Sequence, residues 1–141
     1  MSEVQVINDP AAMSAWAEQT RLQGQRIAFV PTMGALHRGH QALLAEGRKR
    51  ADKLVLSIFV NPIQFGPTED LAKYPRDLPG DLHKAASEGC DLAFVPEAGS
   101  LYAPGFQTSV TVREVSQGLC GARRPGHFAG VATVVCKLFN I

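Results

Sequence analysis

The sequence has little cysteine and no long hydrophobic run, and each shortage excludes a class of protein. Its three cysteines, Cys90, Cys120 and Cys136, form no Cys-x-x-Cys pair, which argues against a disulfide framework or a zinc site. The strongly apolar run at 54–60 is far too short to cross a membrane. No basic segment followed by an apolar one opens the chain, so we expect no secretory signal and predict a cytoplasmic protein.

An excess of charge of one sign is also missing. Lys and Arg number 14 against 13 Asp and Glu, which gives a net charge of +1. This balance gives no reason to expect nucleic acid or an acidic membrane surface as a partner. With 45% hydrophobic and 19% charged residues, the 141 residues are typical of one folded domain, spanning positions 1–141.

Strands alternate with helices along the chain. We predict strands at 4–7, 25–30, 54–60 and 91–95, a possible further strand at 109–112, and helices at 10–22, 39–50, 77–87 and 127–139. This alternation predicts an α/β fold with a doubly wound parallel sheet, in which ligands bind at the carboxyl ends of the strands. Such a fold would continue with another strand after the last helix, so we expect the domain to be incomplete.

His37 and His40 are the most informative residues. They lie between an apolar strand ending at Val30 and the helix predicted from Gly39, so their imidazoles should share one face at a helix N-terminus. Free backbone N–H groups and the positive end of the helix dipole favour an anion there, and phosphate is the usual one. Gly34 and Gly39 allow backbone and ligand to approach closely.

The glycines of this segment do not form either common nucleotide-binding loop. His40 and Gln41 stand where a Walker loop requires Lys and Ser or Thr, and the dinucleotide pattern Gly-x-Gly-x-x-Gly is absent. The segment resembles the His-x-Gly-His signature of Rossmann-like nucleotidyltransferases, which act on the α-phosphate of ATP. Fixed donors stabilise the charge that develops there in the transition state. Two solvated histidines, or a metal pair lacking a clear third ligand, are the alternatives.

Two amides, Asn61 and Gln64, follow the next buried strand. If that strand runs parallel to the one before His37, both amides should converge with the histidines at one edge of the sheet. Amides suit a small substrate with hydroxyl and carboxylate groups. The alternative is a proline-stiffened turn in which the amides only cap the backbone.

Four further positions have more than one interpretation. The basic turn at Arg123 and Arg124 could neutralise phosphates, complete the wall of the site, or simply be solvated. Tyr74 could pack in the interior or serve the site. Met33 could belong to the core or line an apolar pocket.

Four segments together resemble the pantoate–β-alanine ligase family. They are Pro31–His40, Ser57–Phe65, Tyr74–Arg76 and Arg124–Val131, and they occur in the family's order. The resemblance implies that the carboxylate of pantoate attacks the α-phosphate of ATP to give pantoyl adenylate and pyrophosphate. The amine of β-alanine then attacks the activated acyl carbon and releases AMP and pantothenate.

The resemblance also implies a role for each matching residue. ATP would be bound by Met33, Gly34, Ala35, Leu36, His37, Arg38, Gly39 and His40, with His40 as proton donor and His37 as its partner. The substrate-binding residues would be Gln64, Asn61, Pro31, Thr32, Phe65, Arg124 and His127. The resemblance further implies a homodimer and Mg²⁺ that bridges the phosphates of ATP, and we expect no metal ligand from the protein.

The departure from the family is one of length. Similar ligases continue for about as many residues again, with further lysine and glutamine side chains and a smaller C-terminal domain. We therefore expect the family's Rossmann-like scaffold, half of its site, and little or no ligase activity from this chain alone. A non-catalytic nucleotide-binding or dimerisation unit, or another adenylyltransferase that shares His-x-Gly-His, are the alternatives.

Overall fold

The computed structural model describes residues 3–141, so positions 1 and 2 of the predicted domain lie outside the described residues. The helices and strands follow in chain order, with η marking a single 3₁₀ turn: β1 (Gln5–Ile7), α1 (Pro10–Leu22), β2 (Ile27–Thr32), α2 (Arg38–Arg50), β3 (Lys53–Ile58), η1 (Pro62–Gln64), η2 (Leu71–Lys73), α3 (Leu78–Ser87), β4 (Leu92–Phe94), α4 (Ala98–Leu101), α5 (Cys120–Arg123) and α6 (His127–Phe139).

The strands form one parallel sheet, as predicted. Their order is β1-β4-β3-β2, and each neighbouring pair is parallel. Because β2 and β3 are adjacent and run in the same direction, the segments that follow them leave the same edge of the sheet. The predicted α/β doubly wound fold is therefore confirmed.

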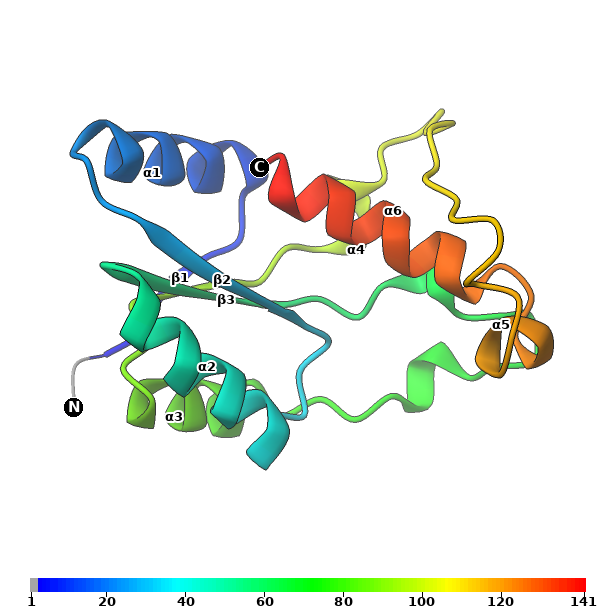
Figure 1. Cartoon of the computed structure of the whole chain (residues 1–141), viewed down its shortest axis with the longest axis horizontal. Helices are drawn as coiled ribbons and strands as arrows, with labels where there is room; N and C mark the ends of the chain where they lie inside the picture. Colours follow the sequence, from blue (N-terminus) through cyan, green and yellow to red (C-terminus); the bar gives the residue numbers. More distant parts are fainter. Residues whose placement is uncertain (1–2) are drawn as a thin grey trace.

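Helices cover both faces of the sheet, which divides the core in two. Figure 1 shows α2 and α3 on one side of the sheet and α1 and α6 on the other. Along β3 the side chains alternate between these two layers: Leu54 and Leu56 pack with residues of α2 and α3, whereas Val55 packs with residues of α1 and α6. This period of two explains why β3 is apolar on both faces.

The strand before the histidines lies two residues later than predicted. We expected a strand at 25–30, but β2 spans Ile27–Thr32 and includes Pro31. Proline is disfavoured inside a sheet because it cannot donate a hydrogen bond to the ladder. Since β2 is at an edge of the described sheet, it tolerates the proline.

The strand predicted at 109–112 is wrong. Those residues form no strand, and the backbone N–H of Val110 instead donates to the hydroxyl of Thr133 on α6 (2.9 Å). Alternating β-branched residues form a strand only where another strand can pair with them. This segment runs beside a helix, and Val112 remains 49% exposed.

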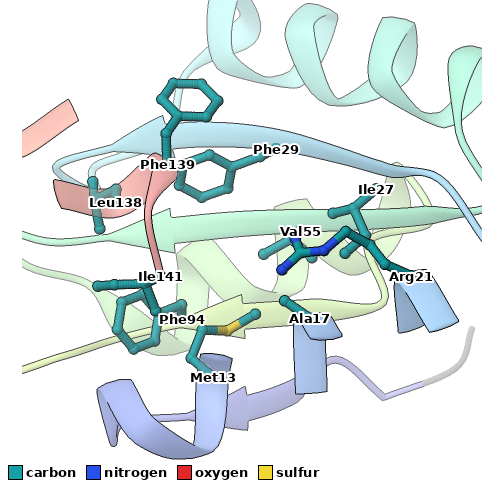
Figure 2. A pocket seen from close by; sticks show the side chains of 10 residues that line it. All are labelled: Met13, Ala17, Arg21, Ile27, Phe29, Val55, Phe94, Leu138, Phe139 and Ile141. Carbon is teal, nitrogen blue, oxygen red and sulfur yellow. The ribbon is translucent and has the colours of Figure 1, made fainter. Parts of the chain in front are cut away.

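An apolar cavity of about 150 Å³ lies between the sheet and the end of α6 (Figure 2). Phe29, Val55, Phe94 and Ile141 are among its lining residues, and Arg21 is the one charged side chain among those that the structure describes around it. None of the residues predicted to bind ATP or pantoate lines this cavity. It therefore has the wrong chemistry for a triphosphate and is separate from the candidate site.

Candidate functional site

The two histidines stack on each other at the start of α2. Their ring centroids lie 4.0 Å apart with 29° between the planes. His37 is the N-cap of the helix, and its Nδ1 accepts a hydrogen bond from the backbone N–H of Gly39 (3.1 Å). In return, Nδ1 of His40 accepts from the backbone N–H of His37 (3.3 Å). The pair therefore forms a capping box, and the expected shared face is confirmed.

This capping determines which ring nitrogens can meet a ligand. A nitrogen that accepts from a backbone N–H carries no proton, so each neutral ring bears its proton on Nε2. Burial, and then the charge that His37 would carry, lower the pKa of His40 below its ordinary value, while the Asp81 carboxylate opposes this. Near neutral pH the His40 ring is accordingly neutral and offers an Nε2–H donor to an anion.

Asp81 on α3 holds the loop that leads to the histidines. Its side chain is only 1% exposed, and its two oxygens accept from the backbone N–H groups of Ala35 (2.9 Å) and Leu36 (2.7 Å). Lys84, one turn later, donates to the carbonyl oxygen of Leu36 (2.7 Å). Charge-assisted bonds of this kind are about twice as strong as neutral ones. Two side chains of α3, one acidic and one basic, therefore hold the loop to this helix.

Gly34 is required by the shape of this loop. Its φ of +82° lies in the left-handed region, and a Cβ there would come within 3.0 Å of Asp81 Oδ2 and of Ile58 Cγ2. Residues with a side chain rarely adopt this conformation. The glycine thus permits the close approach of Asp81 to the loop.

The amide turn after β3 is ordered by buried hydrogen bonds. Asn61 is 1% exposed, and its Nδ2 donates to Gln64 Oε1 (2.9 Å) and to the carbonyl oxygen of Gly130 on α6 (3.0 Å). Its Oδ1 accepts from the hydroxyl of Tyr102 (2.6 Å). The hydrogen-bonding capacity of Asn61 is therefore largely used within the protein, whereas Gln64 keeps its own NH₂ group.

The first turns of α6 lie directly against this turn. A Cβ on Gly130 would lie 2.6 Å from the carbonyl oxygen of Ile63 and 2.7 Å from Cα of Gln64, so only glycine permits the approach. Nδ1–H of His127 donates to the carbonyl oxygen of Gln64 (3.0 Å), because a carbonyl can only accept. Any side chain at position 130 would separate α6 from the turn and displace Gln64.

A cavity of about 210 Å³ lies beside Gln64. Its lining residues come from the end of β2, the amide turn and the inner face of α6: Pro31, Thr32, Met33, Phe59, Asn61, Gln64, Val131, Val134, Val135 and Leu138. A second cavity, of about 380 Å³, shares Met33 and Phe59 with the first and includes Gly34 and Asp81. Segments that leave the ends of β2 and β3 therefore border both cavities, whereas the convergence of His37 and His40 with Asn61 and Gln64 stays a prediction.

Other predicted site residues are engaged by the protein itself. Arg124 forms an ion pair with Glu69, which holds the pKa of that carboxyl below its usual range, and its Nη1 lies 3.4 Å from His127 Nε2. The hydroxyl of Thr32 donates to the carbonyl of Ser57 (2.8 Å). The ring of Phe65 packs edge-on against Tyr74 at 5.9 Å. Thr32 lines the smaller of the two cavities. The imidazoles of His37 and His40 line neither the smaller cavity nor the larger one.

Sequence reasoning missed the residues that support the site. Asp81, Lys84, Tyr102 and Gly130 bond or pack against site segments that lie 41 to 69 positions away along the chain. No local pattern indicates such contacts. The one available signal was Gly130 inside an otherwise apolar helix, since a glycine there suggests close packing.

Within residues 3–141, no three His, Cys, Asp or Glu side chains are grouped as metal ligands. In that same part of the chain no helix is both long enough and apolar enough to span a bilayer. Both oxygens of Asp81, the buried carboxylate nearest the histidine loop, are taken by backbone N–H groups.

These features define a class of α/β protein that carries His-x-Gly-His at a helix N-terminus, at the carboxyl edge of a parallel sheet. A family model described as pantoate-beta-alanine ligase matches residues 5–141. Pantothenate synthetase from Pelobacter propionicus is 63% identical over 129 residues, which are 92% of this chain and 45% of that protein. The one from Geobacter sulfurreducens is 56% identical over 98% of this chain and 49% of its own length.

The solved structures that match this chain carry the same family names. Pantothenate synthetase from Thermus thermophilus superposes with a TM-score of 0.88 at 44% identity, over 97% of this chain and 48% of that one. Pantoate-beta-alanine ligase from Francisella tularensis, complexed with beta-gamma ATP and beta-alanine, superposes with a TM-score of 0.89 at 35% identity. The match covers 97% of this chain and 52% of that one. The chain belongs to the pantoate–β-alanine ligase family, and it spans about half the length of the curated relatives it matches.

Proposed function

We propose that this chain forms the ATP- and pantoate-binding part of a ligase that joins pantoate to β-alanine. Pantoate would occupy the smaller cavity and accept a hydrogen bond from Gln64, and the α-phosphate of ATP would meet the Nε2–H donors of His37 and His40. The observation that carries this proposal is the free NH₂ group of Gln64 in a cavity that is also lined by Met33, where the segment leading to the histidines begins.

The chemistry follows from these two donor sets. A carboxylate oxygen of pantoate forms a bond to the α-phosphorus, and the bond to pyrophosphate breaks. Preorganised Nε2–H donors stabilise the negative charge that builds up on the phosphate oxygens, more in the transition state than in the ground state. The β-alanine amine then displaces AMP from the acyl carbon. Magnesium would enter with ATP as part of the substrate.

The half-length match supports a narrower expectation for this chain alone. In these relatives about half of the chain has no counterpart here, so groups that complete the site can come from that other half. We expect AMP release from pantoate, β-alanine and Mg·ATP to stay near background with this chain. Normal turnover would contradict that expectation. A cytoplasmic location remains a prediction from the sequence, and a homodimer remains a prediction from the family resemblance.

Saturation-transfer NMR with pantoate tests the proposed site. We expect transfer from this chain to the ligand, and a loss of affinity of about 10-fold or more in Gln64→Ala, because a hydrogen bond to a carboxylate contributes about 1.5–3 kcal/mol. Gln19→Ala, an exposed glutamine on α1, is the matched control and should bind normally. Equal binding by both variants would remove Gln64 from the site and with it this proposal.

A further inference from the structure

The orientation of the Gln64 amide follows from a chain of buried hydrogen bonds. The carbonyl oxygen of Gly130 can only accept, so Asn61 must direct its NH₂ group toward α6. The same NH₂ group faces Gln64 at 2.9 Å, so the Gln64 atom at that position must be the carbonyl oxygen Oε1. Gln64 therefore presents its NH₂ group, which can only donate, toward the cavity.

Tyr102 is the last member of this series of hydrogen bonds, at the end away from Gln64. With the NH₂ group of Asn61 directed away, its Oδ1 faces Tyr102, whose hydroxyl donates to it at 2.6 Å. Without that donor, the buried Oδ1 would have no partner among the described residues. Burial raises the pKa of Tyr102 to about 12, so the hydroxyl keeps its proton throughout the neutral range.

The ring of Tyr102 is held independently of its hydroxyl. It packs edge-on against Phe106, with 5.1 Å between centroids, and tilted against Phe59 at 6.2 Å. The ammonium of Lys137 on α6 lies 5.4 Å from the ring centroid, within range of a cation–π contact. Removing only the hydroxyl should therefore leave the ring in place, which makes its role testable without unfolding the chain.

We propose that Tyr102 is a positioning residue that, through Asn61, holds Gln64 in the donor orientation set by the Gly130 carbonyl and so favours a ligand that presents carboxylate or hydroxyl oxygens. This inference rests on the proposed function for the identity of the ligand, pantoate. The hydrogen-bond relay itself, from Tyr102 through Asn61 to Gln64, does not depend on that function. A ligand group that is itself a donor, such as a primary amide NH₂, would meet the Gln64 NH₂ without a partner. The relay thus acts on selectivity as well as affinity.

The experiment is a double-mutant cycle between Tyr102→Phe and Gln64→Ala in this chain. We expect Tyr102→Phe to weaken pantoate binding about 10-fold, since it leaves Asn61 Oδ1 without its donor and loosens Gln64. In the Gln64→Ala background the same change should have no further effect, because the group that it positions is gone. Thr20→Val, which removes the hydroxyl of a buried residue that bonds within α1, is the control and should bind pantoate normally.

A ligand-free measurement separates the relay from the proposed function. Tyr102→Phe should shift or broaden the side-chain NH₂ signals of Gln64 in an ¹⁵N–¹H spectrum, whereas Thr20→Val should not. Unchanged Gln64 signals, or additive losses in the cycle, would overturn the relay. If the unmodified chain fails to bind pantoate while Tyr102→Phe still moves the Gln64 signals, the relay is upheld and the proposed function fails.

Discussion

Replacing His40 with alanine is expected to lower adenylate formation by about 10²–10³-fold in a full-length ligase that carries this sequence. That range is typical for the loss of one preorganised donor to a developing negative charge. The ring of His40 is already fixed before ligand binding, because its Nδ1 accepts from His37 and its face stacks on the His37 ring. The measurement is the rate of pantoate-dependent exchange between ATP and pyrophosphate.

Further variants separate the role of His40 Nε2–H as a donor to the ligand from the role of His40 Nδ1 in capping the helix. His40→Asn can keep an acceptor for the backbone N–H of His37 but has no group at the position of Nε2, so it should be nearly as slow as His40→Ala. The effects of His37→Ala and His40→Ala should not add if both rings act on one charge. His83→Ala, an exposed histidine on α3, should exchange normally. Normal exchange by His40→Ala would remove His40 from the mechanism.

Replacing Asp81 with alanine is expected to destabilise the fold by about 3 kcal/mol and to weaken ATP binding. Two backbone N–H groups, at Ala35 and Leu36, lose a charged acceptor, and the Leu36 side chain is buried. Each hydrogen bond to a charged group contributes about 1.5–3 kcal/mol, and an orphaned buried donor costs about as much. Urea denaturation followed by circular dichroism measures the change in the free energy of unfolding.

Asp81→Asn should fall between the wild type and Asp81→Ala, because its amide oxygen can accept one of the two bonds. Asp9→Ala is the control: it removes the N-cap of α1, where Asp9 accepts from Ala12, at a cost of about 1 kcal/mol. It should leave ATP binding unchanged, since α1 lies on the face opposite α3. If Asp81→Ala cost no more than Asp9→Ala, the loop would not depend on α3.

The parts of the site that could be predicted are those encoded by short segments. The capping residues His37 and His40 are three positions apart, and the amides of Asn61 and Gln64 follow a continuous apolar strand. Parallel pairing of β2 and β3 then brings both segments to one edge, which is a general property of such sheets. Local sequence and one topological rule were sufficient for this much.

The supporting contacts could not be predicted, because they join residues far apart along the chain. The reach of Asp81 to Ala35 and Leu36 depends on how α3 packs beside α2, and the bond from Tyr102 to Asn61 depends on where α4 ends. The strand expected at 109–112 failed for a related reason: its residue pattern is suitable, but the segment lies beside α6 with Val110 bonded to Thr133.

A co-crystal structure with an unreactive analogue of pantoyl adenylate, in which a sulfamoyl group replaces the phosphate, tests the central claim most directly. The analogue should span the edge of the sheet, with its sulfamoyl oxygens within hydrogen-bond distance of Nε2 of His40 and its pantoyl oxygens at Nε2 of Gln64. An analogue that reaches the histidines while its pantoyl group lies outside the cavity beside Gln64 would contradict the account.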